Sequence, residues 1–307
     1  MSGDRVFINE VVARDGLQIE PVFVPTPDKI ALIDALSKTG VAKIEATSFV
    51  SPKAVPALAD AAEVMRGVTR APGVVYVALA PNARGAEAAI SAGADEINLV
   101  ISASESHNQA NVRRSCDQSF DGLASIVRLR EGTKVTLNGT IATAFGCPFE
   151  GRVEPARVLA FARRYRDMGV DGMTLADTTG MANPAQVERL VSDVLAACPD
   201  LPLTLHFHNT RGMGLANIVA AHRAGARSFD AALGGLGGCP FAPGATGNVC
   251  TEDVVHMFEE MGVSTGVDLQ ALIAQSLRLP SLVGHDTPGQ VAKAGPSFAP
   301  RAVCAPA

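Results

Sequence analysis

Amphipathic runs and short aliphatic runs alternate along the chain, and a glycine marks the points where one gives way to the other. In four places an amphipathic run is followed by Gly, then by Val or Ala, and three residues later by Ile, Met or Phe. A glycine directly after such a run is typical of a helix that ends in the left-handed conformation. Each copy therefore predicts the end of a helix and the start of a strand. The four glycines are Gly40, Gly93, Gly169 and Gly225.

Four further runs, rich in aliphatic and β-branched residues, lie between these junctions and are typical of buried strands. They cover residues 6–12, 74–79, 134–142 and 202–208. Helix starts agree with this reading, because Thr26-Pro27 and Asn183-Pro184 each place a capping residue before a first-turn proline. The two sets of strands, each followed by a helix-compatible stretch, predict an α/β fold of the TIM (β/α)8 barrel type. An open doubly wound sheet is the alternative, and it is disfavoured because no G-x-G-x-x-G follows the first strand.

The alternation ends near Gly262. A helical pattern then covers residues 268–279, and a segment rich in Pro and Ala begins near Gly284. We expect residues 1–285 to form a single catalytic barrel with a short C-terminal helical extension that caps it. We expect residues 286–307 to form a flexible tail.

Composition narrows the class of protein. The chain has 307 residues, of which 47% are hydrophobic and 19% charged, which excludes a disordered chain. A net charge of −5, the absence of Trp and only two Tyr argue against nucleic acid as a partner, and the apolar runs are too short to span a bilayer. The six cysteines are widely spaced, without C-x-x-C, and no secretory signal opens the chain, so we expect reduced thiols and a cytoplasmic location. A small-molecule substrate is the remaining expectation.

Polar residues gather where the predicted strands end. In a TIM barrel the chemistry is located at the carboxyl ends of the strands, so these positions are the candidates for a site. They are Glu10, Arg14, Asp15, Glu45, Asn98, Asn138, Thr140, Asp177, Thr178, His206, His208 and Asn248.

Four of these residues form a candidate metal site. His206 and His208 are two apart on a strand, so both imidazoles point to the same side. The first and eighth strands of a closed barrel are neighbours, which lets Asp15 and Asn248 converge with the histidines. This mixed set of nitrogen and oxygen donors suits Mg²⁺ or Mn²⁺, with Zn²⁺ as a further option. The alternative is that the histidines are hydrogen-bonded core residues. Asp177 is expected in the substrate site or as a partner of one histidine.

Four motifs resemble the 3-hydroxy-3-methylglutaryl-CoA lyases. The resemblance extends over about residues 5–285, and the wider relatives include isopropylmalate and homocitrate synthases and some aldolases. The Arg-Asp and His-x-His-Asn elements identify only that superfamily, whereas the Gly-Gly-Cys-Pro loop points to the lyase branch. The motifs are RDGLQ at 14–18, IEATSFVSP at 44–52, GCPFEG at 146–151 and GGLGGCPF at 234–241.

This resemblance implies a divalent-metal-dependent lyase that cleaves 3-hydroxy-3-methylglutaryl-CoA into acetyl-CoA and acetoacetate, as in leucine catabolism and ketone-body formation. Arg14 would stabilise the thioester enolate, Glu45 would position Arg14, and Cys239 would be the catalytic cysteine on a mobile loop. No organic cofactor is implied beyond the CoA of the substrate, and a homo-oligomer, dimer or tetramer, is favoured. The resemblance assigns the metal to Asp15, His206, His208 and Asn248. It assigns the substrate to Arg14, Gln18, Asp177, Thr178, Gly237 and Gly238.

The chemistry explains these residue types. A metal that binds the tertiary alcohol lowers its pKa, and a fixed guanidinium stabilises charge on the thioester oxygen. The base is either Asp15 or a metal-bound water, and Cys239 or a neighbour would return a proton to the enolate carbon.

Two departures from the pattern of the lyases bear on the substrate. Val12-Ala13 replaces the usual Gly-Pro, and Ile19-Glu20-Pro21 replaces a polar run. Because both segments border the substrate entrance, citramalyl-CoA or a longer branched 3-hydroxyacyl-CoA is an alternative substrate. The remaining alternatives are an acetyl-CoA-dependent 2-keto acid condensing synthase and a non-catalytic barrel that binds acyl-CoA.

Overall fold

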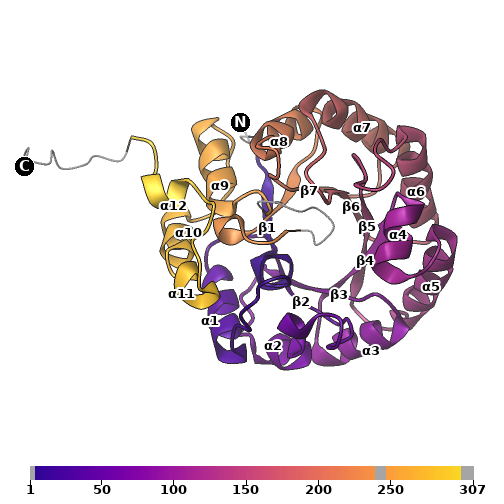
Figure 1. The fold of residues 1–307 in the computed structure, drawn as a ribbon, viewed down its shortest axis with the longest axis horizontal. Helices are drawn as coiled ribbons and strands as arrows, with labels where there is room; N and C mark the ends of the chain where they lie inside the picture. The colour runs from indigo at the N-terminus through magenta and orange to yellow at the C-terminus, as the bar shows by residue number, and fades with distance from the viewer. Residues whose placement is uncertain (1–3, 239–246, 299–307) are drawn as a thin grey trace, which may run out of the picture.

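A closed barrel of parallel strands forms the centre of the molecule (Figure 1). The computed structural model describes residues 4–238 and 247–298. Within them, the eight strands pair in chain order and β1 closes the ring against β8, so the predicted TIM barrel is confirmed. The strands are β1 (Phe7–Glu10), β2 (Lys43–Ser48), β3 (Val75–Leu79), β4 (Glu96–Ser102), β5 (Thr136–Ala142), β6 (Gly172–Asp177), β7 (Leu203–Phe207) and β8 (Ser228–Ala231).

Helices surround the barrel and join each strand to the next. Gly93 follows α3 directly with φ 92°, and the other three predicted junction glycines also have positive φ. Asn183 caps α7 by accepting a hydrogen bond from the Gln186 N–H, as expected. Thr26 is instead the first residue of α1, because its hydroxyl donates to Asp60 rather than capping the helix. The helices are α1 (Thr26–Leu36), α2 (Ala61–Gly67), α3 (Ala83–Ala92), α4 (Glu105–Val112), α5 (Cys116–Leu129), α6 (Pro155–Asp167), α7 (Pro184–Ala197) and α8 (Gly214–Arg223).

Short helices follow the barrel and lie together on one side of it (Figure 1). They confirm the predicted C-terminal helical extension. Part of the predicted tail contacts the barrel, since the Gly289 N–H donates to the carbonyl of Gly234 (3.0 Å). None of the helices in the described ranges is long and apolar enough to cross a membrane. Of these helices, α9 (Thr251–Glu260) follows β8 and packs against β8 and β1 as the last helix of the barrel, and the extension comprises α10 (Leu269–Ser276), α11 (Leu279–Val283) and α12 (Val291–Ala294).

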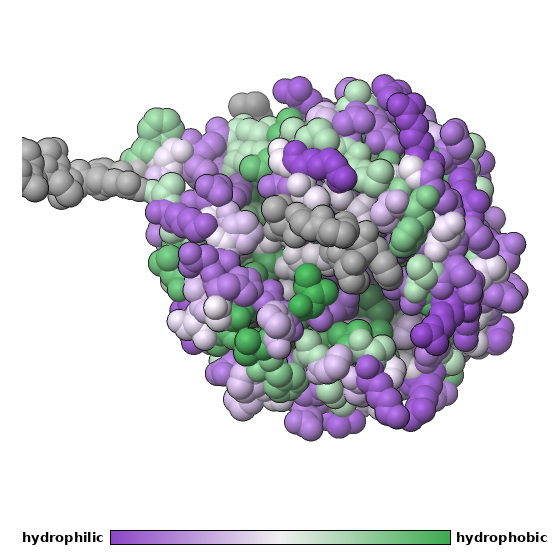
Figure 2. Space-filling view, viewed as in Figure 1, coloured by the Kyte–Doolittle hydropathy of each residue, from purple (hydrophilic) through white to green (hydrophobic). Residues whose placement is uncertain are grey.

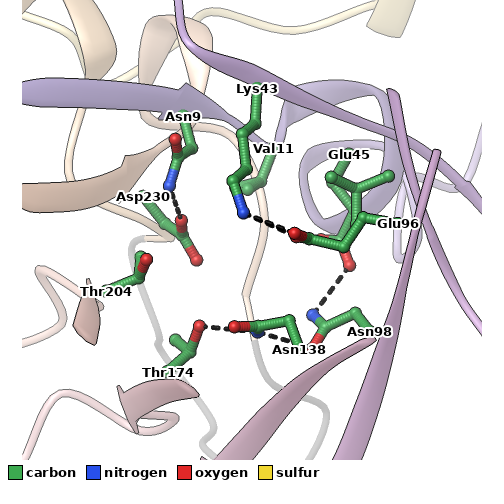
Figure 3. A pocket seen from close by; sticks show the side chains of 11 residues that line it. Asn9, Val11, Lys43, Glu45, Glu96, Asn98, Asn138, Thr174, Thr204 and Asp230 are labelled. Carbon is green, nitrogen blue, oxygen red and sulfur yellow. Dashed lines mark hydrogen bonds and ion pairs between the residues drawn. The ribbon is translucent and has the colours of Figure 1, made fainter. Parts of the chain in front are cut away.

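Polar side chains fill part of the barrel interior (Figure 3). Lys43 on β2 forms an ion pair with Glu96 on β4 (2.6 Å), and Asn9 on β1 donates to Asp230 on β8 (2.9 Å). Hydrogen bonding compensates for the removal of these groups from water. Because Asp230 also approaches His206 on β7, this interior layer supports the carboxyl-end face of the barrel.

Candidate metal centre and active site

Two histidines and one aspartate converge at the carboxyl end of the barrel. His206 lies on β7 and His208 follows it directly, and their Nε2 atoms are 3.1 Å apart. Asp15 Oδ2 is 3.8 Å from His206 Nε2 and 3.6 Å from His208 Nε2. All three side chains are buried, and one ligand atom from each lies within 4.8 Å of the others. The structure thus brings together three of the four residues predicted to bind metal in a geometry that one cation can bridge.

Asn248 completes this group from the segment before α9. Its Nδ2 donates hydrogen bonds to Asp15 Oδ2 (2.7 Å) and to the carbonyl of Leu236 (3.0 Å). The backbone at Asn248 also pairs with that at His208. An asparagine amide carries one donor end and one acceptor end, and its oxygen is the end that ligates a cation.

The chemistry of these donors fits a divalent cation. Imidazole nitrogens, a carboxylate and an amide oxygen form a set suited to Mg²⁺, Mn²⁺ or Zn²⁺. Burial alone would raise the pKa of Asp15, but the Arg14 guanidinium and the two imidazoles hold that pKa well below its usual range. Asp15 is therefore a carboxylate, the form that binds a cation. Within the described ranges, His208 Nδ1 is buried without a hydrogen-bond partner, so Asp15 and the neighbouring imidazole are the groups that orient this ring.

Asp230 supports the site from behind His206. Its Oδ2 lies 3.3 Å from His206 Nδ1, while its Oδ1 accepts the hydrogen bond from Asn9. A proton on Nδ1 leaves Nε2 free to bind a cation, which is the usual arrangement of a metal-ligating histidine. The sequence motifs did not single out Asp230. The only signal was its place on β8 opposite His206 on β7, which becomes visible once the register of the two strands is known.

Arg14 lies beside the metal-binding group and is held by two carboxylates. Its Nε donates to Glu45 Oε2 (2.6 Å), and its Nη1 donates to Asp15 Oδ1 (2.6 Å). Burial by itself would lower the pKa of Arg14, but the neighbouring Glu45 and Asp15 raise it above its ordinary value. Glu45 also accepts a hydrogen bond from Asn98 (3.1 Å). The guanidinium is therefore a fixed cation, and Glu45 contacts it as expected.

The turn that carries Arg14 and Asp15 is a π-helical turn, η1 (Val12–Gly16), directly after β1. The N–H groups of Arg14, Asp15 and Gly16 all approach the carbonyl of Val11, at 3.2, 2.8 and 3.2 Å. This tight arrangement presents two consecutive charged side chains at the end of one strand. Such single-turn π-helical segments are frequent at functional sites.

The glycine-rich segment after β8 comes close to the same group. Gly237 has φ 103°, and a Cβ atom at this position would lie 2.5 Å from Asn248 Nδ2 and 3.0 Å from the Asp15 carbonyl oxygen. Only glycine fits there, because both the conformation and the space exclude a side chain. The segment thus packs its backbone against the metal-binding group. Cys239, predicted to be catalytic, lies outside the residues that the structure describes.

A cavity of about 580 Å³ opens beside this group. Its other walls include the apolar side chains of Val50, Val55, Leu79 and Val100. Figure 2 shows the corresponding face, with hydrophilic residues around the periphery and hydrophobic residues nearer the centre. Of the candidate site residues predicted from the sequence, those that line the cavity are Arg14, Asp15, Gln18, Asn98, Thr140, Thr178, His206, His208 and Gly238.

Asp177 has a different environment from these residues. It is fully buried at the end of β6, and its carboxylate accepts hydrogen bonds from the N–H groups of Met181 (2.7 Å) and Ala182 (3.1 Å). Burial raises the pKa of this carboxyl group. Its hydrogen bonds hold the loop between β6 and α7, whereas the carboxylates that approach His206 are those of Asp230 and Asp15.

The chain is similar to a set of known lyases along almost its whole length. The family model described as HMGL-like matches residues 5–278. The hydroxymethylglutaryl-CoA lyase YngG of Bacillus subtilis is 43% identical, over 93% of this chain and 96% of that protein. The (R)-citramalyl-CoA lyase of Chloroflexus aurantiacus is 45% identical, over 96% of both chains. Among solved structures, an HMG-CoA lyase from Acinetobacter baumannii in complex with coenzyme A and 3-methylmalate is 56% identical. It covers 99% of both chains with a TM-score of 0.95.

Proposed function

The chain belongs to the HMGL-like family and is a carbon–carbon lyase, and we propose that it cleaves 3-hydroxy-3-methylglutaryl-CoA into acetyl-CoA and acetoacetate with the help of a divalent cation. The observation that carries this proposal is the convergence of Asp15, His206 and His208 beside the fixed guanidinium of Arg14. Both features line one cavity. A cation site next to a buried positive charge suits a reaction in which an alcohol loses its proton and an enolate leaves.

In this reaction Asp15, His206 and His208 would hold the cation, with Asn248 as the fourth ligand. When bound, a divalent cation acts as a Lewis acid that lowers the pKa of the tertiary alcohol of the substrate. Mg²⁺ or Mn²⁺ suits the oxygen-containing donor set, and Zn²⁺ is the alternative. Asp230, through its contact with Nδ1, would orient His206 so that Nε2 is available to hold the cation.

Arg14 acts on the other product. As the carbon–carbon bond breaks, negative charge grows on the thioester oxygen of acetyl-CoA. The Arg14 guanidinium, fixed by Glu45 and Asp15, stabilises this charge without having to reorient. The proton for the enolate carbon is assigned to Cys239, which follows the cavity-lining Gly238 in the chain. Gln18, Thr178, Gly237 and Gly238 are assigned to the substrate-binding side of the site, whereas Asp177 is assigned to holding the loop between β6 and α7.

A second candidate substrate is favoured by the similarity to an (R)-citramalyl-CoA lyase. Citramalyl-CoA differs from 3-hydroxy-3-methylglutaryl-CoA by one methylene group between the carboxylate and the tertiary alcohol, and its cleavage gives pyruvate instead of acetoacetate. A pocket distinguishes substrates that differ by one methylene about 10- to 200-fold.

We expect kcat/KM for 3-hydroxy-3-methylglutaryl-CoA to exceed that for citramalyl-CoA at least about tenfold. Steady-state assays with each thioester, in which acetoacetate and pyruvate are quantified separately, measure this ratio. A ratio below one would make citramalyl-CoA the preferred substrate. Acetyl-CoA-dependent condensation with a 2-keto acid, without cleavage of either thioester, would identify a synthase.

Asp230→Asn is expected to weaken the affinity for Mn²⁺ about 10- to 100-fold, because the carboxylate that orients His206 is lost. Titration calorimetry with MnCl₂ on the purified variant measures the change. Thr204→Val is the matched control, since Thr204 donates to Ser228 in the same interior layer (3.0 Å). Equal Mn²⁺ affinity of Asp230→Asn and the wild type would show that Asp230 does not orient the ligand.

For the assembly and setting of the enzyme, we propose a homo-oligomer, dimer or tetramer, in the cytoplasm. Its binding partner is the acyl-CoA thioester, and we propose that it binds neither nucleic acid nor a membrane. The cleavage assigned to it belongs to leucine catabolism and ketone-body formation.

A further inference from the structure

One buried carboxyl group contacts three segments that lead into the candidate active site. Glu10, the last residue of β1, is fully buried. Its Oε1 accepts hydrogen bonds from the N–H groups of Val12 (2.8 Å) and Leu233 (2.9 Å), and its Oε2 pairs with the hydroxyl of Thr251 (2.8 Å). These three partners come from separate parts of the chain: Val12 is two residues away, whereas Leu233 and Thr251 lie more than 200 positions later.

Each contact of Glu10 fixes a different segment. Val12 is the first residue of η1, the turn that carries Arg14 and Asp15. Leu233 is the first residue of η3 (Leu233–Gly235), the 3-10 turn that opens the glycine-rich segment. Thr251 is the first residue of α9, three positions after Asn248. One carboxyl group therefore sets the spacing between the Arg14 turn, the glycine-rich segment and the Asn248 segment.

A second buried carboxyl group, that of Glu252, binds the residue that follows Leu233. The N–H of Gly234 donates to Glu252 Oε2 (3.1 Å), and the hydroxyl of Ser276 on α10 donates to Glu252 Oε1. The two successive N–H groups of Leu233 and Gly234 are thus accepted by two different acids. Gly234 has φ 65°, and a Cβ atom there would lie 2.8 Å from Leu279 Cδ1. Leu279, the first residue of α11, therefore packs directly against this turn.

The fixed turn transmits its position directly to the metal-binding group. Two residues after Gly234, the carbonyl of Leu236 accepts the hydrogen bond from the Asn248 side chain, which also contacts Asp15. The next residue, Gly237, is packed against the Asp15 backbone. A shift of η3 would therefore move Leu236 and Gly237 relative to Asp15 and Asn248.

We infer that Glu10 is a positioning residue of this enzyme, which holds η1, η3 and the start of α9 in register through the hydrogen bonds of its carboxyl group. Among residues 4–238 and 247–298, its carboxyl group hydrogen-bonds neither to residues that line the cavity nor to the metal-binding side chains, so its effect on the reaction passes through these segments.

Burial of Glu10 favours the neutral acid, whereas its hydrogen bonds favour the carboxylate. Its hydrogen-bond partners in the described ranges are two backbone N–H groups and one hydroxyl, and the acid that faces it from α9 is Glu252. Burial is the largest effect and raises the pKa of Glu10 to about 8, with a further contribution from the charge of Glu252, although the hydrogen bonds from Thr251, Leu233 and Val12 act in the opposite direction. In the neutral form the carbonyl oxygen accepts both N–H groups and the acid O–H donates to Thr251, whose hydroxyl serves as donor or acceptor.

The test compares two uncharged replacements of similar size. Glu10→Gln keeps a carbonyl oxygen for Val12 and Leu233 and an NH₂ group for Thr251, whereas Glu10→Met fills the space without any acceptor of comparable strength. We expect Glu10→Gln to keep kcat within about threefold of the wild type and Glu10→Met to lose at least about tenfold, since small displacements of reacting groups are costly. Glu96→Gln, which alters a buried carboxyl group of the interior layer, is the matched control and is expected to keep kcat.

Hydrogen exchange measured by mass spectrometry on residues 231–238 provides a second readout. Glu10→Met should accelerate exchange in this segment while Glu10→Gln should not. The kcat comparison rests on the proposed lyase function, but the exchange comparison does not. If the wild type fails to cleave any thioester while exchange responds as expected, the proposed function fails and the positioning role stands. Wild-type kcat, KM and exchange in Glu10→Met would overturn the positioning role. A Glu10→Gln variant as impaired as Glu10→Met would show that Glu10 acts through its charge.

Discussion

Arg14→Ala is expected to lower kcat about a hundredfold or more, because the charge that stabilises the leaving enolate is lost. The loss should fall on kcat rather than on cation binding, since Arg14 contacts the metal-binding group only through Asp15 Oδ1, whereas Asp15 Oδ2 faces the histidines. Steady-state kinetics with 3-hydroxy-3-methylglutaryl-CoA and a parallel Mn²⁺ titration measure the two quantities separately.

Removal of Arg14 also leaves the buried carboxylates of Asp15 and Glu45 without their common partner, which destabilises the fold. Arg14→Gln reduces this effect because its amide still donates to one carboxylate, and it should lose kcat to a similar extent. Arg14→Lys keeps the charge but cannot form both contacts at once, so we expect an intermediate kcat. A loss of only a fewfold in both neutral variants, with Mn²⁺ affinity unchanged, would contradict the role of the guanidinium in stabilising charge.

The second large effect is expected for His208→Ala, which should weaken Mn²⁺ affinity more than about 100-fold. Loss of a residue that only orients a ligand weakens metal affinity by about 100-fold at most, and His208 is expected to be a ligand itself. His208 Nε2 is one of three atoms that surround the candidate cation position. The measurement is calorimetric titration with MnCl₂, supported by the melting temperature with and without the cation. A cation that binds only the folded state raises the melting temperature, so the wild type should gain stability and His208→Ala should not.

His222→Ala is the matched control for this experiment. His222 lies on α8 and is 3.0 Å from Asp4, away from the metal-binding group. Its removal should leave Mn²⁺ affinity at the wild-type value. Wild-type affinity in His208→Ala would mean that the two histidines are hydrogen-bonded core residues.

Sequence alone predicted the barrel because its signals are local. A glycine at a helix end, a capping asparagine such as Asn183 and runs of buried aliphatic residues reflect the conformation of a few adjacent residues. The convergence of Asp15 with the histidines also followed, since a closed barrel must place its first strand beside its last. Thr26 does not cap α1 as predicted, because its hydroxyl donates to Asp60. This partner is 34 positions away in the chain, so the local sequence pattern does not reveal it.

The residues that support the site could not be assigned their roles from the sequence. No motif assigns a role to Asp230 or to the strand-end residue Glu10, and the contacts of Asp230 with His206 and of Glu10 with Leu233 and Thr251 join residues far apart in the chain. His206 meets Asp230 only through the register of β7 and β8, and Glu10 meets Leu233 only after the π-helical turn and the glycine-rich segment have taken their conformations. Side-chain types at strand ends identify the candidate reacting groups, but their support depends on register and loop geometry.

Incubation of the purified protein with Mn²⁺ and 3-hydroxy-3-methylglutaryl-CoA tests the proposed function most directly. We expect acetyl-CoA and acetoacetate to form in equal amounts, the reaction to stop when the cation is chelated, and full activity to return when Mn²⁺ or Mg²⁺ is added back. Failure to release acetyl-CoA from this thioester with Mn²⁺, Mg²⁺ or Zn²⁺, from protein that binds the cation, would contradict the proposed function.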